Sequence, residues 1–329
     1  MNELPPDQVI TELTMAHFAT RCLQVIAEVG VADALGGAPM GVAELAARTG
    51  VNADALGRML RLLAAQGVFA EGPDGYIHTP ASEMLRSDHP RSLRAYARMI
   101  GMPAMWSRVT GLEQALRTGL PVADWANLLE YFSGHPTEAS LFNAAMVAKA
   151  GGVVPEVVAA YDFKTFNVIA DIGGGRGHLL SAVLEAAPGA SGILFDLPQV
   201  VEDAGASVSP RMTLQPGDFF ADQLPLADAY LLMEVIHDWA LPEATAILQA
   251  VRRAAPAHAR LLIVEALVSE EPGPHFSKTL DVAMLAFTGG RERTSAEYQA
   301  LLSATGFKLE RVLPTRTPYS VVEATVATV

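Results

Sequence analysis

Four glycines within five positions follow a short apolar segment, and this arrangement restricts the possible folds more than any other part of the sequence. Residues 167–172 read Asn-Val-Ile-Ala-Asp-Ile, residues 173–177 read Gly-Gly-Gly-Arg-Gly, and an apolar helical pattern begins at His178. Glycine allows a positive φ and a close approach of the backbone to a ligand, and the first turn of a helix has free N–H groups. The segment therefore predicts a strand, a tight turn and a helix that form a site for a nucleotide-like cofactor.

Beyond residue 166, short apolar runs alternate with amphipathic segments, and this alternation indicates the fold class. Strands are expected at 167–171, 192–196, 211–215, 228–235, 259–267, 307–313 and 318–325, and helices at 177–187, 199–205, 242–254, 278–287 and 295–304. Seven strands in this order predict an α/β fold, with a doubly wound, mostly parallel sheet covered by helices on both faces. Only residues 314–317 separate the last two strands, which predicts a terminal antiparallel hairpin. Thr294 and Glu297 fit a capping box.

The N-terminal part has a different pattern, in which helices precede a hairpin. Apolar residues recur at helical spacing over 9–29, 42–48 and 53–65, and two short strands flank the turn at 71–75. Helix, helix and hairpin in this order are typical of a winged-helix domain. We therefore expect three parts, listed by residue number: a winged-helix-like dimerisation domain at 1–95, a helical connector at 96–160 that contributes to the substrate pocket, and a cofactor-binding domain at 161–329.

A winged-helix domain often binds DNA, and Arg58 and Arg61 lie on the helix that would enter the groove. The net charge of −13 opposes this function, because DNA binding depends on a basic surface. The Ala- and Leu-rich helices favour packing and dimerisation instead. We therefore expect a small-molecule partner, a homodimer and no nucleic acid, and a DNA-binding regulator remains the alternative.

Composition also indicates the cellular compartment. The chain has 329 residues, half of them hydrophobic, and one cysteine, Cys22. One cysteine cannot form an intrachain disulfide or a Cys-based metal site, which suits a reducing compartment. The N-terminus lacks a basic region before an apolar run, and the apolar runs near 228–236 and 259–268 are too short to span a bilayer. These features predict a soluble, cytoplasmic protein without a membrane association or a bound metal.

Acidic residues follow the first three strands of the predicted sheet. Asp171, Asp196 and Asp218 stand at these strand ends, and in an open parallel sheet a ligand lies beyond the carboxyl ends of the strands. A nicotinamide dehydrogenase would also place an acid about 20 residues after its glycines. Its third glycine, however, would fall at position 178, which is a histidine here. A dehydrogenase is therefore the weaker interpretation.

The fourth and fifth strands end near His237 and Glu265. An imidazole at this edge is well placed to act as a general base, because its pKa lies near neutrality, and a carboxylate such as that of Glu265 could orient the ring. The alternative is a histidine that caps a helix or packs in the core. Glu292, in the loop Gly-Gly-Arg-Glu-Arg-Thr at 289–294, either points into solvent or reaches the same edge, and spacing favours neither.

Five motifs together resemble those of the plant-type small-molecule O-methyltransferases that use S-adenosylmethionine (SAM), a family with caffeate, flavonoid and bacterial natural-product enzymes. They are Asp-Ile-Gly-Gly-Gly-Arg-Gly at 171–177, Phe-Asp-Leu-Pro at 195–198, Gly-Asp-Phe-Phe at 217–220, Ile-His-Asp-Trp at 236–239 and Glu-Arg-Thr at 292–294. The resemblance covers nearly the whole chain. It implies a class I methyltransferase fold with a dimerising winged-helix domain.

The resemblance also implies roles for individual residues. In the cofactor site, Asp171 faces the methionine ammonium, Gly173 and Gly175 let the backbone approach the methionine part, Asp196 and Leu197 hold the ribose side, and Asp218 and Phe219 receive the adenine. His237 would be the base, flanked by Glu265 and Glu292. The acceptor would contact Asn143, Met146, Asp238, Met284 and Thr288. Glu234 departs from the pattern, since many members carry a lysine there, and we assign it no role.

We therefore expect an SN2 methyl transfer from SAM to a hydroxyl of a small aromatic or polyketide-like natural product, with S-adenosylhomocysteine as the other product. His237 would take the proton from this hydroxyl. Three alternatives remain: a relative that methylates carbon or nitrogen, a relative with non-methylating SAM chemistry, and a winged-helix regulator with a SAM-sensing domain.

Overall fold

The computed structural model describes residues 5–123, 125–204 and 209–327. The chain forms two compact units. The first contains residues 1–106 and 131–149, and the second contains residues 107–130 and 150–329. The division into three domains at residues 95 and 160 stays a prediction.

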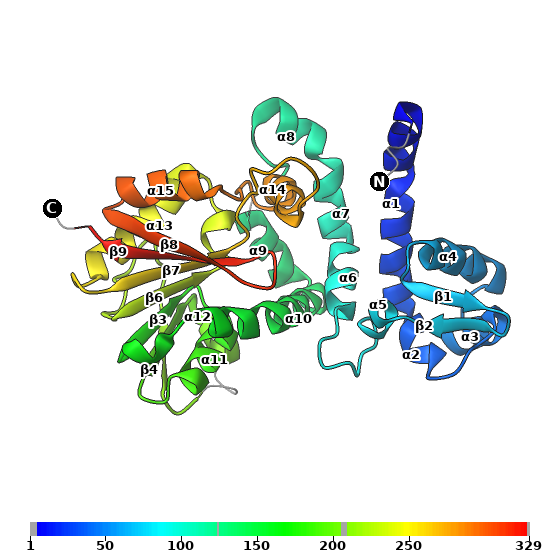
Figure 1. The fold of residues 1–329 in the computed structure, drawn as a ribbon, viewed down its shortest axis with the longest axis horizontal. Coiled ribbons are helices and arrows are strands. Elements are labelled where there is room, and N and C mark those ends of the chain that lie inside the picture. Colours follow the sequence, from blue (N-terminus) through cyan, green and yellow to red (C-terminus); the bar gives the residue numbers. More distant parts are fainter. Residues whose placement is uncertain (1–4, 124, 205–208, 328–329) are drawn as a thin grey trace. The chain divides into compact units, whose positions relative to one another are not determined.

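The first unit follows the predicted order of helices and hairpin (Figure 1). Its elements are α1 (Pro6–Val29), α2 (Val31–Leu35), α3 (Val42–Thr49), α4 (Ala53–Ala65), β1 (Phe69–Gly72), β2 (Gly75–His78), α5 (Pro80–Glu83) and α6 (Arg94–Ile100). Strands β1 and β2 pair antiparallel. Residues Ile26, Leu45, Leu60 and Phe69 belong to one buried apolar cluster, which joins α1, α3 and α4 to the hairpin.

Residues 103–160 are mostly helical, as predicted, and they are divided between the two units. They contain α7 (Pro103–Thr110), α8 (Leu112–Thr118), α9 (Trp125–Gly134) and α10 (Pro136–Ala160). Among the described helices, α10 alone is long and apolar enough to cross a membrane by length and composition. Its C-terminal part packs into the core of the second unit through Val153, Val154 and Val157, and core helices of soluble proteins pass the same test.

The second unit is built on a seven-stranded sheet with the order β5-β4-β3-β6-β7-β9-β8. The strands are β3 (Val168–Ile172), β4 (Ser191–Asp196), β5 (Met212–Pro216), β6 (Ala229–Met233), β7 (Arg260–Glu265), β8 (Phe307–Pro314) and β9 (Ser320–Val326). The first five pair in parallel, whereas β9 pairs antiparallel with both β7 and β8. The chain runs outward from β3 to β5 and returns to β6, so the switch point lies between β3 and β6.

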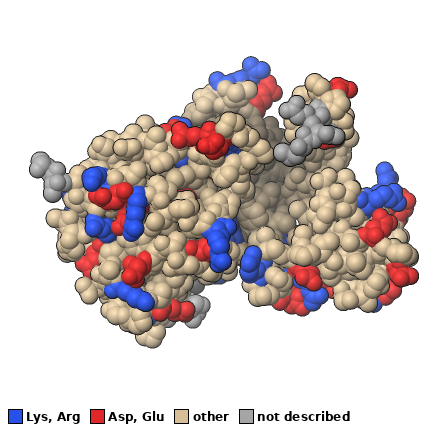
Figure 2. All heavy atoms as spheres, viewed as in Figure 1, with Lys and Arg blue, Asp and Glu red and all other residues tan. Residues whose placement is uncertain are grey.

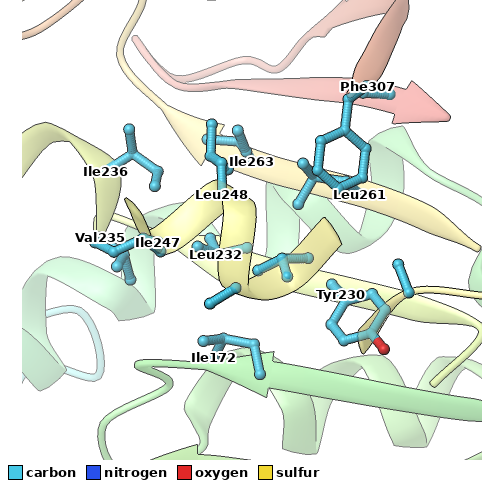
Figure 3. Packing of buried hydrophobic residues seen from close by; sticks show 14 of the residues in the cluster. Ile172, Tyr230, Leu232, Val235, Ile236, Ile247, Leu248, Leu261, Ile263 and Phe307 are labelled. Carbon is cyan, nitrogen blue, oxygen red and sulfur yellow. The ribbon is translucent and has the colours of Figure 1, made fainter. Parts of the chain in front are cut away.

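Helices cover both faces of this sheet, which confirms the doubly wound α/β prediction (Figure 1). The helices are α11 (His178–Ala186), α12 (Pro198–Ala204), α13 (Leu241–Ala254), α14 (Phe276–Phe287) and α15 (Ser295–Ala304), with short 3₁₀ turns η1 (Phe163–Thr165) and η2 (Ile236–Asp238). Figure 3 shows Ile247 and Leu248 of α13 against Leu232 and Ile263 of the sheet. On the other face, α10, α11 and α14 form a second buried cluster with the sheet. The predicted capping box of Thr294 and Glu297 begins α15.

Charged side chains of both signs are interspersed over the surface. Figure 2 shows Lys and Arg next to Asp and Glu over the face in view. Ion pairs such as Arg98–Glu28 and Arg316–Glu156 lie at the surface of their own units. The predicted lack of a nucleic acid partner stays a prediction.

Candidate active site

The glycine turn after β3 folds back over the side chain that precedes it. Gly173, Gly175 and Gly177 have φ values of 69°, 58° and 74°, a region that side chains with a Cβ rarely adopt. A Cβ on Gly174 would lie 2.5 Å from the Cγ of Asp171. The turn therefore needs glycine both for its backbone conformation and for its distance from this carboxyl.

Asp171 is a buried acid without a normal hydrogen bond. Its side chain is 1% exposed, and neither carboxylate oxygen has a hydrogen-bond partner in the described chain. Burial, with the charge of Asp196, raises its pKa to about 7, although the nearby Leu180 N–H acts in the opposite direction. An unpaired buried carboxylate is costly, and such groups occur where a ligand supplies a positive charge or a donor.

Asp196 connects the glycine turn to the end of β4. Its Oδ2 accepts a hydrogen bond from the Gly175 N–H at 2.7 Å, and its Oδ1 accepts one from the Leu197 N–H at 2.7 Å. Burial raises the pKa of Asp196, and these two bonds act in the opposite direction. The structure thus brings together Asp171, Gly173, Gly175, Asp196 and Leu197 at the carboxyl ends of β3 and β4, beside the switch point.

An aromatic group lies beside the turn. The Phe219 ring is 3.7 Å from an ideal Cβ at Gly173, and it packs edge to face with Phe220 and Trp239 at centroid distances of 4.8 and 6.0 Å. Asp218 accepts a hydrogen bond from the Phe220 N–H at 2.8 Å. This edge therefore offers an apolar surface on which a flat heterocycle could pack.

His237 lies in η2, directly after β6, and is 4% exposed. Its Nδ1 is 2.6 Å from Glu292 Oε1, and its Nε2 is 3.8 Å from Asp238 Oδ1. Its backbone N–H donates a hydrogen bond to Glu265 Oε1 at 2.9 Å. The Glu265 carboxylate thus contacts the backbone of His237 and not its ring, and the catalytic roles of His237, Glu265 and Glu292 stay predictions. The ring is paired with Glu292, because the end of β7 reaches the backbone of η2 rather than its side chain.

The charges around His237 decide its protonation. Burial by itself would lower the pKa of His237, but the carboxylates of Asp238, Glu292 and Glu265 outweigh burial and raise it to about 10. Burial also raises the pKa of Glu265. In this structure the imidazolium form of His237 is thus strongly stabilised by its neighbours.

The loop at 289–294 reaches the sheet edge, which answers the question that spacing left open. Glu292 and Arg293 are both buried, while Arg291 is exposed. A Cβ on Gly290 would clash with the carbonyl oxygen of His237, and the Glu292 N–H donates to Asp281 Oδ1 of α14 at 3.0 Å. The paired glycines therefore allow the loop to pack directly on η2.

The residues expected to contact the acceptor lie in different places. Thr288 supports the loop, since its hydroxyl accepts a hydrogen bond from the Gly290 N–H at 3.1 Å. Met284 is buried in the cluster between α14 and the sheet. Asn143 and Met146 are half-buried on the part of α10 that belongs to the first unit. The substrate roles of these four residues, and that of Asp238, stay predictions.

Sequence reasoning assigned no role to three residues at this edge. Arg293 and Tyr298 are buried around Glu265, and the Tyr298 hydroxyl contacts Glu265 Oε2. Glu234 has a φ of 55°, unusual for a residue with a side chain, and accepts a hydrogen bond from the Tyr319 hydroxyl at 2.7 Å. Arg293 stands in the charged run Arg-Glu-Arg at 291–293, which looks like part of a solvated loop, so only burial could reveal its role. Within the described residues, no cluster of His, Cys, Asp and Glu could hold a metal ion.

Two segments of the chain match known protein families. Residues 105–308 match an O-methyltransferase domain, and residues 11–88 match an O-methyltransferase dimerisation domain. A phenazine O-methyltransferase from Lysobacter antibioticus is 40% identical over 98% of this chain and 96% of its own length. An 8-amino-8-demethylriboflavin N,N-dimethyltransferase from Streptomyces davaonensis is 34% identical over 92% of this chain and 90% of its own length.

Solved structures resemble the chain over almost its full length. A methyltransferase of calicheamicin biosynthesis, solved with S-adenosylhomocysteine, has a TM-score of 0.89 and 34% identity, with 99% of this chain and 100% of that chain covered. Human N-acetylserotonin methyltransferase, solved with SAM, has a TM-score of 0.90 and 26% identity, with 99% of each chain covered.

We predict that Asp171→Asn stabilises the protein in the absence of ligand. Because the pKa of Asp171 is raised in the folded chain, its carboxyl group keeps its proton until about pH 7, whereas in the unfolded chain it loses the proton from about pH 4. The stability difference between variant and wild type should therefore grow from pH 4 to 7 and then stay constant, at most on the order of 4 kcal/mol. Thermal unfolding at a series of pH values measures it.

The control for this prediction is Glu271→Gln, which neutralises an exposed carboxylate in the same unit. It should leave the unfolding temperature nearly unchanged at every pH. An Asp171→Asn protein that is less stable than wild type at pH 8 would show that the carboxylate is stabilised by the fold.

Proposed function

The chain belongs to the SAM-dependent small-molecule O-methyltransferase family, and we propose that it methylates a hydroxyl of a small aromatic or polyketide-like natural product. The proposal is supported by the phenazine and calicheamicin relatives, which act in natural-product biosynthesis. The observation that carries it is the buried pair of His237 and Glu292 at the same sheet edge as the glycine turn. The predicted cytoplasmic location belongs to the same proposal.

The residues of the switch point fit SAM as the methyl donor. Asp171 offers an unpaired carboxylate for the positively charged methionine part, and Asp196 stands at the end of β4, where a ribose hydroxyl could be bound. The aromatic surface of Phe219 suits the adenine. When bound, SAM supplies a methyl group that is activated on a positively charged sulfur.

His237 would act as the general base. Glu292 holds Nδ1, so the proton on this nitrogen is fixed and Nε2 is the atom that can take a proton from the acceptor hydroxyl. The deprotonated oxygen would accept the methyl group, SAM would leave as S-adenosylhomocysteine, and Nε2 of His237 would hold the proton taken from the hydroxyl. Base catalysis of this kind contributes about 10²- to 10⁴-fold.

Transfer to nitrogen is a second candidate because a relative is named as an N,N-dimethyltransferase. Methyl transfer from labelled SAM across a panel of phenols, catechols, quinols, hydroxylated polyketides and aromatic amines tests both candidates. Label on oxygen in the product, located by mass analysis and NMR, supports the main proposal. Label on nitrogen or carbon alone would contradict it, and so would an absence of labelled product from every acceptor.

For the best acceptor, we predict that His237→Gln lowers kcat by about 10²- to 10⁴-fold and leaves the Kd for SAM within about threefold. Because the pKa of His237 is raised to about 10 in the free protein, wild-type kcat/KM should rise with pH from about 7 towards 10, as the proton is lost. This rise should be absent in His237→Gln. Steady-state rates and calorimetry provide the measurements, with an acceptor whose hydroxyl does not titrate in this range. A variant with the wild-type rate would exclude His237 as the base.

We also propose a homodimer formed through the first unit, which the matched dimerisation domain supports. Every residue from 5 to 18 is exposed, including Ile10 and Leu13 at 66% and 69%, so the described residues of the chain leave this apolar part of α1 uncovered. We predict that Leu13→Asp with Phe18→Asp gives a monomer by light scattering, because charges would be buried in the interface. Thr14 is also exposed, and Thr14→Asp is the control that adds a charge to the helix without removing an apolar side chain. A wild-type monomer, or a double variant that remains dimeric, would refute the proposal.

A further inference from the structure

We propose that Arg293 is a positioning residue that fixes the turn carrying His237 and balances the acidic groups around it. The proposal rests on the proposed role of His237 as the base. The hydrogen bonds of the Arg293 guanidinium go to the backbone carbonyls of Ile236, Arg291 and Trp239, so it would act through the backbone of η2.

The guanidinium of Arg293 holds both ends of the turn. Its Nη1 donates to the carbonyl oxygen of Ile236 at 3.1 Å, and its Nη2 donates to that of Trp239 at 3.1 Å. These two carbonyls flank His237 and Asp238. The planar guanidinium thus bridges the start and the end of the segment whose direction determines where the imidazole points.

The remaining polar groups of the His237 backbone are held by the same surroundings. Its N–H donates to Glu265 Oε1 at 2.9 Å, and its carbonyl oxygen accepts from the Arg291 N–H at 2.8 Å. Glu292, which pairs with the ring, is the neighbour of Arg293 in the chain. One loop therefore supplies both the partner of the ring and the clamp on its backbone.

Arg293 also provides positive charge where acids predominate. The groups that face His237 are Asp238 from its own turn, Glu265 from β7 and Glu292 from the loop, with Asp281 of α14 behind Glu292. Arg293 is 2% exposed and interacts electrostatically with Glu265, and its guanidinium carbon lies 6.0 Å from the centre of the Tyr298 ring. A buried guanidinium needs such partners, and the acids need a cation for the same reason.

A lysine cannot replace this clamp. Its ammonium is a single charge on a flexible chain, so it retains the charge but cannot present the two fixed donors that span Ile236 and Trp239. The positioning and electrostatic contributions can therefore be separated. Arg293→Lys removes mainly the geometry, whereas Arg293→Gln removes the charge as well.

The experiment compares Arg293→Lys, Arg293→Gln and the control Arg291→Gln in the full-length protein. Arg291 belongs to the same loop, but its side chain is exposed and pairs with Glu297. Arg293→Lys should lower kcat by about 10- to 100-fold with KM for SAM within about threefold, because displacing the base affects the reaction rather than cofactor binding. The rise of kcat/KM with pH should occur over the same pH range in Arg293→Lys as in wild type.

Arg293→Gln should lower kcat and also shift the rise of kcat/KM to higher pH, since loss of a nearby cation raises the pKa of His237. Arg291→Gln should resemble wild type.

The double variant His237→Gln/Arg293→Lys tests whether the effect passes through the base, and it should be no slower than His237→Gln alone. The affinity for SAM, measured by calorimetry, checks that each variant is folded. The test can be made with either Arg293 variant, provided that this variant binds SAM. Three results would overturn the role of Arg293. The first is a wild-type kcat in a folded Arg293 variant, and the second is a loss of kcat in Arg291→Gln as large as that in Arg293→Lys. The third is that Arg293→Lys lowers kcat in the His237→Gln background by the same factor as in the wild-type background. A fully active His237→Gln would instead overturn the base itself.

Discussion

The parallel pairing of β3 to β7 is the constraint on which the site depends. Hydrogen bonds between neighbouring parallel strands align their carboxyl ends, so residues far apart in sequence emerge at one edge. Asp171, Asp196 and Glu265 end β3, β4 and β7, and His237 follows β6. The return of the chain from β5 to β6 leaves this edge open at the switch point. Without the parallel register, the glycine turn and the histidine would have no common site.

The same edge concentrates groups that a stable core would avoid. Asp171 is buried without a hydrogen bond of normal geometry, and His237 lies among three carboxylates with one buried arginine behind them. The apolar clusters on the two faces of the sheet provide the stability that tolerates these charges. Such a distribution is expected of a ligand site, because unpaired charge and unusual backbone conformation persist where binding or reaction makes use of them.

The accuracy of the sequence predictions follows the range of the interactions involved. The strands, the helices, the capping box of Thr294 and the glycine turn are signalled by patterns among neighbouring residues, and the structure contains all of them. The sequence placed both Glu265 and Glu292 beside His237 but could not decide which one contacts the ring, because this depends on how β7 and the loop at 289–294 approach η2. The clamp by Arg293 could not be predicted either, since nothing in its local sequence distinguishes a buried arginine from the exposed Arg291.

The sequence by itself determined the elements, the family and the set of acids and glycines at the strand ends. These features are encoded by hydrophobic period, turn residues and motif spacing, which are properties of neighbouring residues. Only the tertiary structure decided which carboxylate pairs with the imidazole, that Asp171 has no partner, and that Arg293 holds the turn. The reason is physical: burial, charge pairing and pKa depend on distances between segments that are tens of residues apart, and these distances exist only once the sheet has assembled.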